Sequence, residues 1–239
     1  MEKIVYALWR KPGEDRTALN AHLRDEAVPA LLGLANVRGL RLNLQDADVV
    51  RAEPLRQHGP GEQMDAVVQV WIDAAHDMFR RPVDDILATA CDRLEAWVVL
   101  ASDVIPNTLH PSREGERTEG WSQFCFIRRP ERLSPEEWRH NWQVLHTPVG
   151  IETQSNFEYI QNFVVRPITE GAVPYAAIVE ECFPADAMDD SHVFFNAVGD
   201  QALYDANLAT MSESCSHFIE MPGGIHVLPT SQYDYRRPN

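Results

Sequence analysis

The stretch NWQVLHTPVG, residues 141–150, ends a segment in which aromatic and polar side chains recur at helical spacing. Trp138 and Trp142 fall on one face of the expected helix, and Asn141 lies close to the same face as His146. Histidine titrates near neutrality without perturbation, so it is the usual general acid or base. Indole rings beside it would exclude water and suit a flat, apolar ligand. The pattern predicts a catalytic His146 in an aromatic cleft, and the alternative is a histidine that only caps its helix.

Further polar residues are candidates for the same cleft. Glu180 and Glu181 lie on an expected strand at 175–183, and strand alternation lets only one of them face the cleft. Burial there would raise the pKa of the carboxyl and make it a useful base. Asn141 could orient a carbonyl or steady an oxyanion. Tyr159, on an expected strand at 157–165, and His217, on an expected last strand at 215–220, are supporting candidates for substrate binding.

The sequence lacks the common motifs for metals and nucleotides. No H-x-H or HExxH spacing is present, and neither is a P-loop, GxGxxG or G-x-S-x-G pattern. The four cysteines are far apart without a CxxC pair, which favours buried, reduced thiols over a zinc ribbon or a disulfide framework. We therefore expect no metal and no cofactor.

Charge narrows the range of partners. The 239 residues carry 21 Lys and Arg against 36 Asp and Glu, a formal charge of −15. A field of that sign repels phosphate backbones and anionic lipids, so we expect no nucleic acid and no membrane partner. The longest apolar runs, such as AWVVLA at 96–101, are too short to cross a bilayer, and the first residues do not resemble a signal peptide. The cytoplasm is the expected location.

The chain repeats itself at an offset of about 119 residues, as a comparison of its two halves shows. YALWRKP (6–12) matches FCFIRRP (124–130), and LNAHLRDEAVPAL (19–31) matches WRHNWQVLHTPVG (138–150). The polar, turn-rich stretch PNTLHPSREGERTEG lies between the halves. We expect a first repeat at 1–105, a linker at 106–120 and a second repeat at 121–239 that holds the active site.

Each half predicts the same order of elements. In the second half, Ser134, Pro135 and Glu137 give a helix start with a capping box, and Pro148 predicts that this helix ends near His146. Strands and a second helix follow in the order βαββαβ, which is a ferredoxin-like unit with one bare sheet face. The expected fold is α+β: two ferredoxin-like repeats whose bare faces meet in one intramolecular pseudo-dimeric α+β barrel.

The segment RRPERLSPEEWRHNWQVLHTPVG (128–150) resembles the opening of an EthD domain, with its R-x-P turn and a helix that leads to tryptophan, a Leu-His pair and Thr-Pro. MDAVVQVWID (64–73) and AIVEECF (177–183) resemble a later strand of that family, which usually carries an acidic residue where Gln69 and Glu180 stand. The chain thus looks like a tandem EthD-domain protein. This resemblance implies a dimeric α+β barrel and favours Glu180 over Glu181. The wider superfamily includes small cofactor-independent enzymes that act on aromatic or polyketide-like molecules.

These observations predict a cofactor-independent lyase, dehydratase or cyclase that acts on a small aromatic or polyketide-like molecule. His146 would be the general acid or base, Glu180 its partner and Asn141 a polar orienter. Trp138, Trp142, Tyr159 and His217 would bind the substrate. The alternatives are a non-catalytic binding protein, a haem enzyme with His146 as axial ligand, and a cofactor-free oxygenase. A homodimer is a further expectation.

Overall fold

The computed structural model describes residues 1–236, and both halves of the chain follow the order βαββαβ. The first half contains β1 (Glu2–Trp9), α1 (Arg16–His22), η1 (Leu23–Ala27), α2 (Val28–Leu32), β2 (Val37–Leu44), η2 (Ala47–Leu55), β3 (Ala66–Ile72), α3 (Asp77–Ala90) and β4 (Arg93–Ile105). The second half contains β5 (Trp121–Ile127), α4 (Pro135–Arg139), η3 (His140–His146), α5 (Thr147–Thr153), β6 (Glu158–Pro167), β7 (Ala177–Phe183), η4 (Ala185–Met188), α6 (Ser191–Phe194), α7 (Gln201–Ser216) and β8 (Ile225–Arg236). β4 and β5 are joined by residues 106–120.

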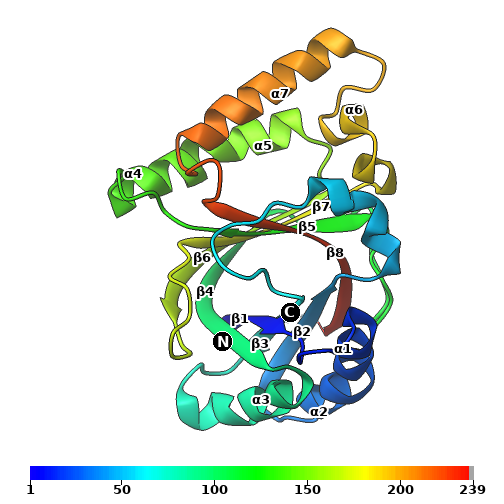
Figure 1. Cartoon of the computed structure of the whole chain (residues 1–239), viewed down its shortest axis with the longest axis vertical. Coiled ribbons are helices and arrows are strands. Elements are labelled where there is room, and N and C mark those ends of the chain that lie inside the picture. Colours follow the sequence, from blue (N-terminus) through cyan, green and yellow to red (C-terminus); the bar gives the residue numbers. More distant parts are fainter. Residues whose placement is uncertain (237–239) are drawn as a thin grey trace.

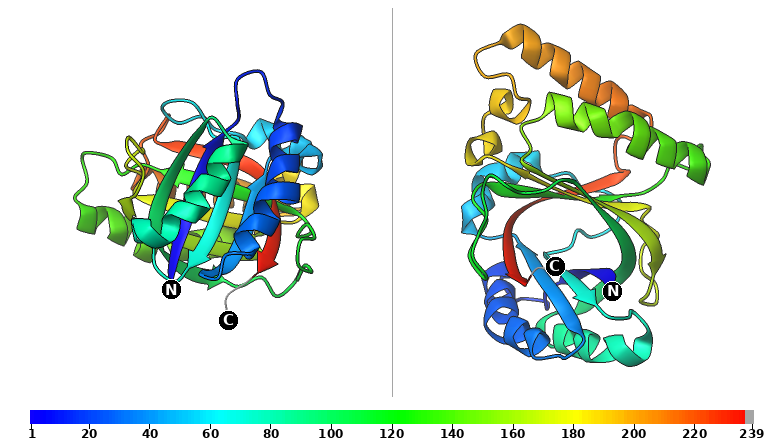
Figure 2. Two further views of the ribbon diagram at one scale, coloured as in Figure 1. Left: turned by 90° about the horizontal axis from the view of Figure 1, so that it is seen from below. Right: turned by 180° about the vertical axis from the view of Figure 1, so that it is seen from behind.

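The strands form one closed barrel in the order β1-β3-β2-β8-β5-β7-β6-β4, with helices only on its outside (Figure 1). Each half contributes four consecutive strands of this order, and the halves join through the antiparallel pairs β2–β8 and β4–β6. Figure 2 shows the helices of the two halves at opposite ends of the molecule. The predicted pseudo-dimeric α+β barrel is confirmed. Among residues 1–236, no helix has the length and apolar character needed to cross a bilayer.

The prediction that the helix ends near His146 is wrong, because α4, η3 and α5 run without a break from Pro135 to Thr153. Thr147 stays in the right-handed helical region although Pro148 follows it. The turn before the proline is a π-helix, and its wider geometry accommodates a residue that has no backbone N–H. The first half has the same arrangement, because the π-helical η1 precedes Pro29 there.

The expected last strand at 215–220 is also wrong. Residues up to Ser216 belong to α7, His217 caps that helix and is exposed, and the last strand is β8 at Ile225–Arg236. Met211 is the one α7 residue that is buried, so the helix has no apolar stripe that would reveal it in the sequence. The aromatic and β-branched residues Phe218 and Ile219, which follow the helix cap directly, instead resemble part of a strand.

The barrel interior is apolar at one end and polar at the other. Trp97, Phe124 and Phe126 belong to the apolar cluster. Arg41, on β2, occupies the polar part and is 3% exposed. Its guanidinium donates to Asp234 Oδ1 at 2.6 Å, Glu180 Oε2 at 2.8 Å and Glu158 Oε1 at 3.2 Å. One first-half cation therefore holds three carboxylates of the second half inside the barrel.

Replacing Arg41 by methionine should lower the free energy of unfolding by about 3–5 kcal/mol, because three buried carboxylates lose their cation. Urea unfolding at pH 7 measures this. Arg38→Met is the matched control on the same strand, since Arg38 pairs with Asp73 at the exposed surface. The control should leave the free energy of unfolding nearly unchanged, because water screens an exposed ion pair. Equal losses in both variants would contradict a central role for Arg41.

Candidate active site

A cavity of about 200 Å³ lies between the second-half sheet and the helices that cover it. Its floor comes from β5, β6, β7 and β8, and its roof comes from η3, α7 and the end of α6. The lining includes Gln57, Gln123, Cys125, Trp142, His146, Gln154, Tyr159, Glu181, Phe194, Phe195, Met211, Cys215, Phe218 and Val227. Aromatic and sulfur-containing side chains thus surround a small number of polar groups, as in many sites for small apolar molecules.

Glu181 is the acidic group of this cavity. The strand register places Gln123 and Tyr159 directly opposite it on the two neighbouring strands, so the three side chains share one face of the sheet. Its carboxylate accepts hydrogen bonds from Asn156 Nδ2 at 3.0 Å and from Gln123 Nε2 at 3.3 Å. Burial raises the pKa of Glu181 to about 7, although the two amide donors act in the opposite direction. Glu181 is therefore poised to exchange a proton near neutral pH.

His146 lines the same cavity from the helical side. Its Nδ1 lies 2.9 Å from Ser214 Oγ on α7, and its ring lies 4.6 Å from the ring of Phe218. Burial lowers the pKa of His146 to about 4, so the imidazole is neutral at neutral pH. The helix continues for seven residues beyond it, which removes the reading of His146 as a helix stop. A neutral imidazole can still donate one N–H hydrogen bond to a substrate oxygen.

Tyr159 adds a third polar group. Its hydroxyl accepts a hydrogen bond from Gln161 Nε2 at 2.8 Å, and the same amide donates to Thr147 Oγ1 at 2.8 Å. Burial raises the pKa of Tyr159, so its O–H stays protonated at neutral pH. Because the oxygen accepts from Gln161, its own hydrogen can be donated to a ligand.

The other residues predicted from the sequence take several places. Trp142 lines the cavity, whereas Trp138 lies outside the lining set and donates from Nε1 to the carbonyl of Phe218 at 2.9 Å. Asn141 donates to the carbonyl of His217 at 3.1 Å and also does not line this cavity, so its predicted contact with a substrate stays a prediction. The same holds for His217, which is exposed at the end of α7.

The expectation that Glu180 faces His146 is wrong. Glu180 points into the barrel, where it is 0% exposed and bonded to Arg41. Burial opposes its charge, but Arg41 and the amide donors outweigh burial and hold the pKa of Glu180 well below its usual range. The sequence showed that either Glu180 or Glu181 faces the helices, and the structure shows that it is Glu181. In the structure, Val179 and Glu181 both face the helices, as alternation along the strand requires.

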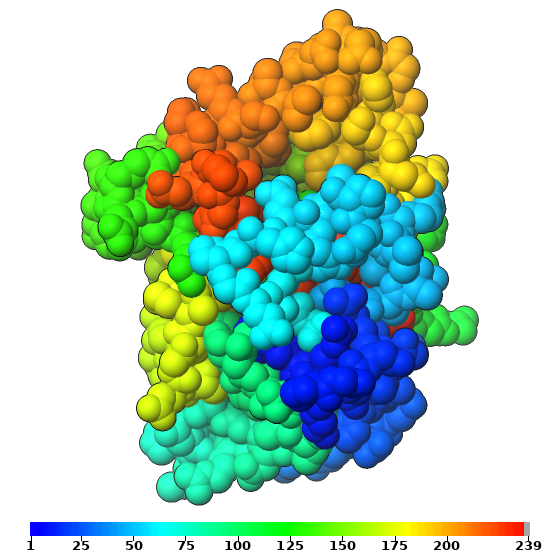
Figure 3. Space-filling view, viewed as in Figure 1, coloured from blue at the N-terminus to red at the C-terminus, as the bar shows by residue number. Residues whose placement is uncertain are grey.

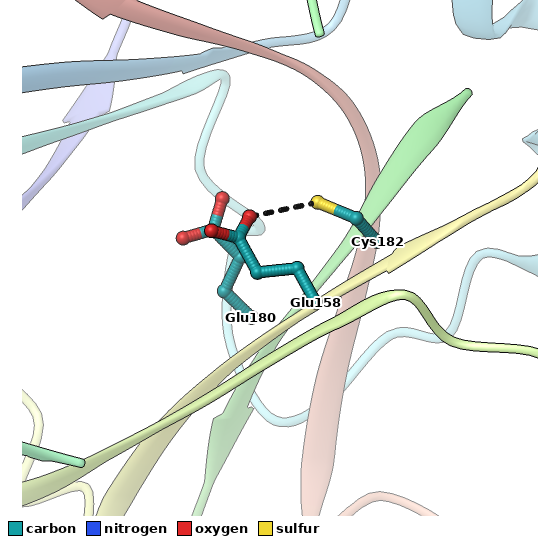
Figure 4. A group of neighbouring side chains, drawn as sticks. All are labelled: Glu158, Glu180 and Cys182. Carbon is teal, nitrogen blue, oxygen red and sulfur yellow. Dashed lines mark hydrogen bonds between the residues drawn. The ribbon is translucent and has the colours of Figure 1, made fainter. Parts of the chain in front are cut away.

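Glu158, Glu180 and Cys182 lie together inside the barrel and could in principle ligate a metal (Figure 4). The Nε2 of Gln232, however, donates to all three, at 2.6 Å to Glu158, 2.8 Å to Glu180 and 3.3 Å to Cys182. Burial and the adjacent carboxylates also raise the pKa of the Cys182 thiol, which disfavours the thiolate that a metal needs. This cluster is satisfied by amide donors and does not fit a metal site.

Haem does not fit the His146 cavity either. The cavity measures about 200 Å³, which is far smaller than a four-pyrrole macrocycle. His146 is in addition confined between Ser214 and the ring of Phe218. The haem alternative therefore has no support in the geometry of the site.

The corresponding space in the first half is filled by its own core. Leu19, Leu23, Val83 and Leu87 are all 0% exposed there and pack in one cluster. Ala27 ends the π-helix where His146 ends it in the second half. The cavity with polar side chains therefore lies in the second half, and apolar side chains fill the corresponding space in the first half.

The fold resembles two solved structures along the whole chain. One is an anthrone oxidase-like protein, with a TM-score of 0.51, 7% identity, and coverage of 100% of this chain and 94% of that chain. The other, from Fusobacterium nucleatum subsp. nucleatum, is named as a candidate monooxygenase, with a TM-score of 0.50, 10% identity, and coverage of 100% and 94%. The chain has the dimeric α+β barrel fold. No family model matches its sequence, and no curated protein gives a significant match.

Glu181→Gln should stabilise the protein at alkaline pH. The pKa of Glu181 is raised from 4.5 to about 7 in the folded protein, so the folded state loses stability as the pH rises through this range. Glutamine cannot ionise. We therefore expect the free energy of unfolding of the variant to exceed that of the wild type by on the order of 2 kcal/mol at pH 8 and by little at pH 4. Urea unfolding at both pH values measures the difference.

The matched control for this experiment is Glu152→Gln, which changes an exposed carboxyl in α5. It should leave the free energy of unfolding unchanged at both pH values. A gain for Glu181→Gln that is the same at pH 4 and pH 8 would contradict the raised pKa.

Proposed function

We propose that this protein is a cofactor-independent enzyme that removes a proton from a small hydroxyaromatic molecule and lets the resulting anion react with O2. The observation that carries the proposal is the Glu181 carboxyl, which has a pKa of about 7 and faces an aromatic cavity together with His146 and Tyr159. A base with a pKa near the working pH combines a useful deprotonated fraction with a strong pull on the proton.

Glu181 acts as the general base in this proposal. When it takes the substrate proton, negative charge spreads over the ring and collects on a ring oxygen. The Tyr159 O–H and the N–H of the neutral His146 are the donors available to that oxyanion, and such donors are worth more in a site that excludes water. Trp142 and Phe218 supply flat apolar walls for the ring. The role of general base that the sequence suggested for His146 thus passes to Glu181 in this proposal, and His146 becomes the hydrogen-bond donor.

The oxidative step needs only O2 as co-reactant. An electron-rich carbanion passes one electron to O2, and the two radicals combine into a peroxide anion at the same carbon. This anion takes back the proton from Glu181 and becomes a hydroperoxide. Loss of water from that hydroperoxide converts a ring CH2 group into a carbonyl. One oxygen atom ends in the product and the other in water, so no external reductant is required.

Two further observations support this class of reaction. The structural neighbours are named as an anthrone oxidase-like protein and a candidate monooxygenase, although they share only the fold with this chain. The segment 128–150 also resembles an EthD domain, and this resemblance supports our proposal that the chain is a tandem EthD-like barrel.

A non-oxidative lyase, dehydratase or cyclase is the second candidate. The same base and the same neutral donors suffice for proton abstraction followed by loss of water or ring closure, because neither step needs O2. Oxygen consumption separates the two candidates. A binding protein without activity would show neither oxygen consumption nor product.

Glu181→Gln should reduce the rate of substrate-dependent oxygen uptake by about 10²–10⁴-fold, the usual contribution of a general base. For the wild type, kcat/KM should rise with pH through about 7 and then level off, because the reaction needs the deprotonated carboxyl. An oxygen electrode with a panel of phenols, hydroquinones and anthrones measures both effects. Turnover that persists in Glu181→Gln would exclude Glu181 as the base.

Ser214→Ala should lower kcat by about tenfold and leave KM nearly unchanged, since Ser214 fixes the tautomer and orientation of His146 through one hydrogen bond. Ser212→Ala is the matched control on the same helix, because the Ser212 hydroxyl donates only to the carbonyl of Leu208. A similar loss in both variants would indicate damage to α7 and not a role for His146.

A further inference from the structure

A second chamber of about 480 Å³ adjoins the active-site cavity. Residues of both halves form it: Arg51, Pro54, Leu55, Arg56 and Gln57 from the first half, and Gln123, Ala187, Met188, Asp189, Ser191, Phe194 and Phe195 from the second. Gln57, Gln123, Phe194 and Phe195 line both chambers. These four residues therefore mark the junction between an inner chamber with Glu181 and an outer chamber between the halves.

The walls of the outer chamber are held in place. Arg51 donates to both oxygens of Asp189, each at 2.8 Å, and so ties η2 to the end of η4. Phe194 stacks on Phe183 with ring centroids 4.5 Å apart. In the space-filling view, the first-half segment that contains η2 lies directly against the second-half segment that contains η4 and α6 (Figure 3, cyan and yellow). The chamber is thus a built feature of the fold and not a gap between loose loops.

Gln57 is exposed and differs from Gln123, the other polar residue at the junction. Its backbone is fixed, because its N–H donates to the carbonyl of Val227 at 3.1 Å and its carbonyl accepts from the Val227 N–H at 2.9 Å. Its side-chain amide, in contrast, makes no hydrogen bond with any residue in 1–236, whereas the amide of Gln123 is engaged by Glu181. A fixed backbone that carries a free donor and acceptor at the junction suits recognition of a polar substituent.

We propose that the outer chamber binds the distal part of an elongated, fused-ring substrate and that Gln57 hydrogen-bonds a hydroxyl or carbonyl on its outer ring. The inner chamber alone is only somewhat larger than the engineered 150 Å³ cavity that accommodates benzene, so it holds the reacting ring and little more. Pro54, Leu55 and Met188 give the outer chamber apolar surfaces for further rings. The inference rests on the proposed function, and it makes Gln57 a specificity-determining residue supplied by the first half.

The test compares two ligands that do not need turnover. Catechol fits the inner chamber, and 2-hydroxyanthraquinone extends into the outer one with a hydroxyl on its terminal ring. Isothermal titration calorimetry on the full chain gives Kd for both ligands with the wild type, Gln57→Leu and Leu55→Trp. Gln57→Leu removes the free amide without removing an internal hydrogen bond, and Leu55→Trp fills the outer chamber. Gln143→Leu, on η3 outside both chambers, is the matched control, because the Gln143 amide also makes no hydrogen bond with any residue in 1–236.

Gln57→Leu should raise the Kd of 2-hydroxyanthraquinone by about tenfold, the effect of one lost hydrogen bond. The Kd of catechol should change by less than twofold. Leu55→Trp should raise the Kd of the three-ring ligand by at least as much and again leave the Kd of catechol unchanged. Unchanged binding of the three-ring ligand to both variants would overturn the inference and leave the proposed function intact. If the wild type binds catechol but not 2-hydroxyanthraquinone, the inference is likewise overturned and the proposed function stays intact. If neither ligand binds the wild type, the proposed function fails, and the inference fails with it.

Discussion

The interaction on which the rest of the structure depends is the contact of Arg41 with Glu158, Glu180 and Asp234 inside the barrel. The cation comes from β2 and the carboxylates come from β6, β7 and β8, so the contact joins the two halves at their common centre. It also fixes the register of β7, because Glu180 must point inward. Since successive side chains of a strand alternate, Glu181 must then point outward into the cavity. A shift of β7 by one residue would exchange the two glutamates and place the proposed base against Arg41.

The same contact explains why the halves have diverged. The first half supplies Arg41, Asn43 and Gln69 to the interior, where the two amides donate to Glu180 at 2.6 and 2.9 Å. Its own helix-facing cleft is packed with leucine and valine side chains and has no room for a ligand. Its long excursion between β2 and β3 instead reaches across to the second half and forms the wall that contains Gln57. The two halves thus enclose one candidate site, with most of its polar groups in the second half and part of its wall in the first.

The fold could be predicted because each half repeats local signals that do not depend on its partner. The capping box at Ser134 lies where the sequence places it, whereas Pro148 lies inside the helix that it was expected to end. The orientation of Glu180 could not be predicted in the same way. All seven residues of β7 are buried, because one face meets the barrel interior and the other meets the helices. A strand that is buried on both sides has no hydrophobic alternation, so its sequence does not show which glutamate faces which way. The exposed His217 was misplaced for a related reason, since α7 lacks an apolar stripe.

The electrostatics of the cavity follow from burial more than from any pair of charges. The same loss of water raises the pKa of Glu181 and lowers that of His146, so both groups favour their neutral forms. At neutral pH the cavity therefore contains a partly ionised carboxyl and a neutral imidazole. An imidazolium beside Glu181 would stabilise the carboxylate and weaken it as a base. With a neutral imidazole, Glu181 keeps its basicity, and the negative charge that remains on the substrate after proton removal is met by hydrogen-bond donors that carry no charge of their own. That arrangement suits an uncharged aromatic molecule that becomes an anion only after it is bound.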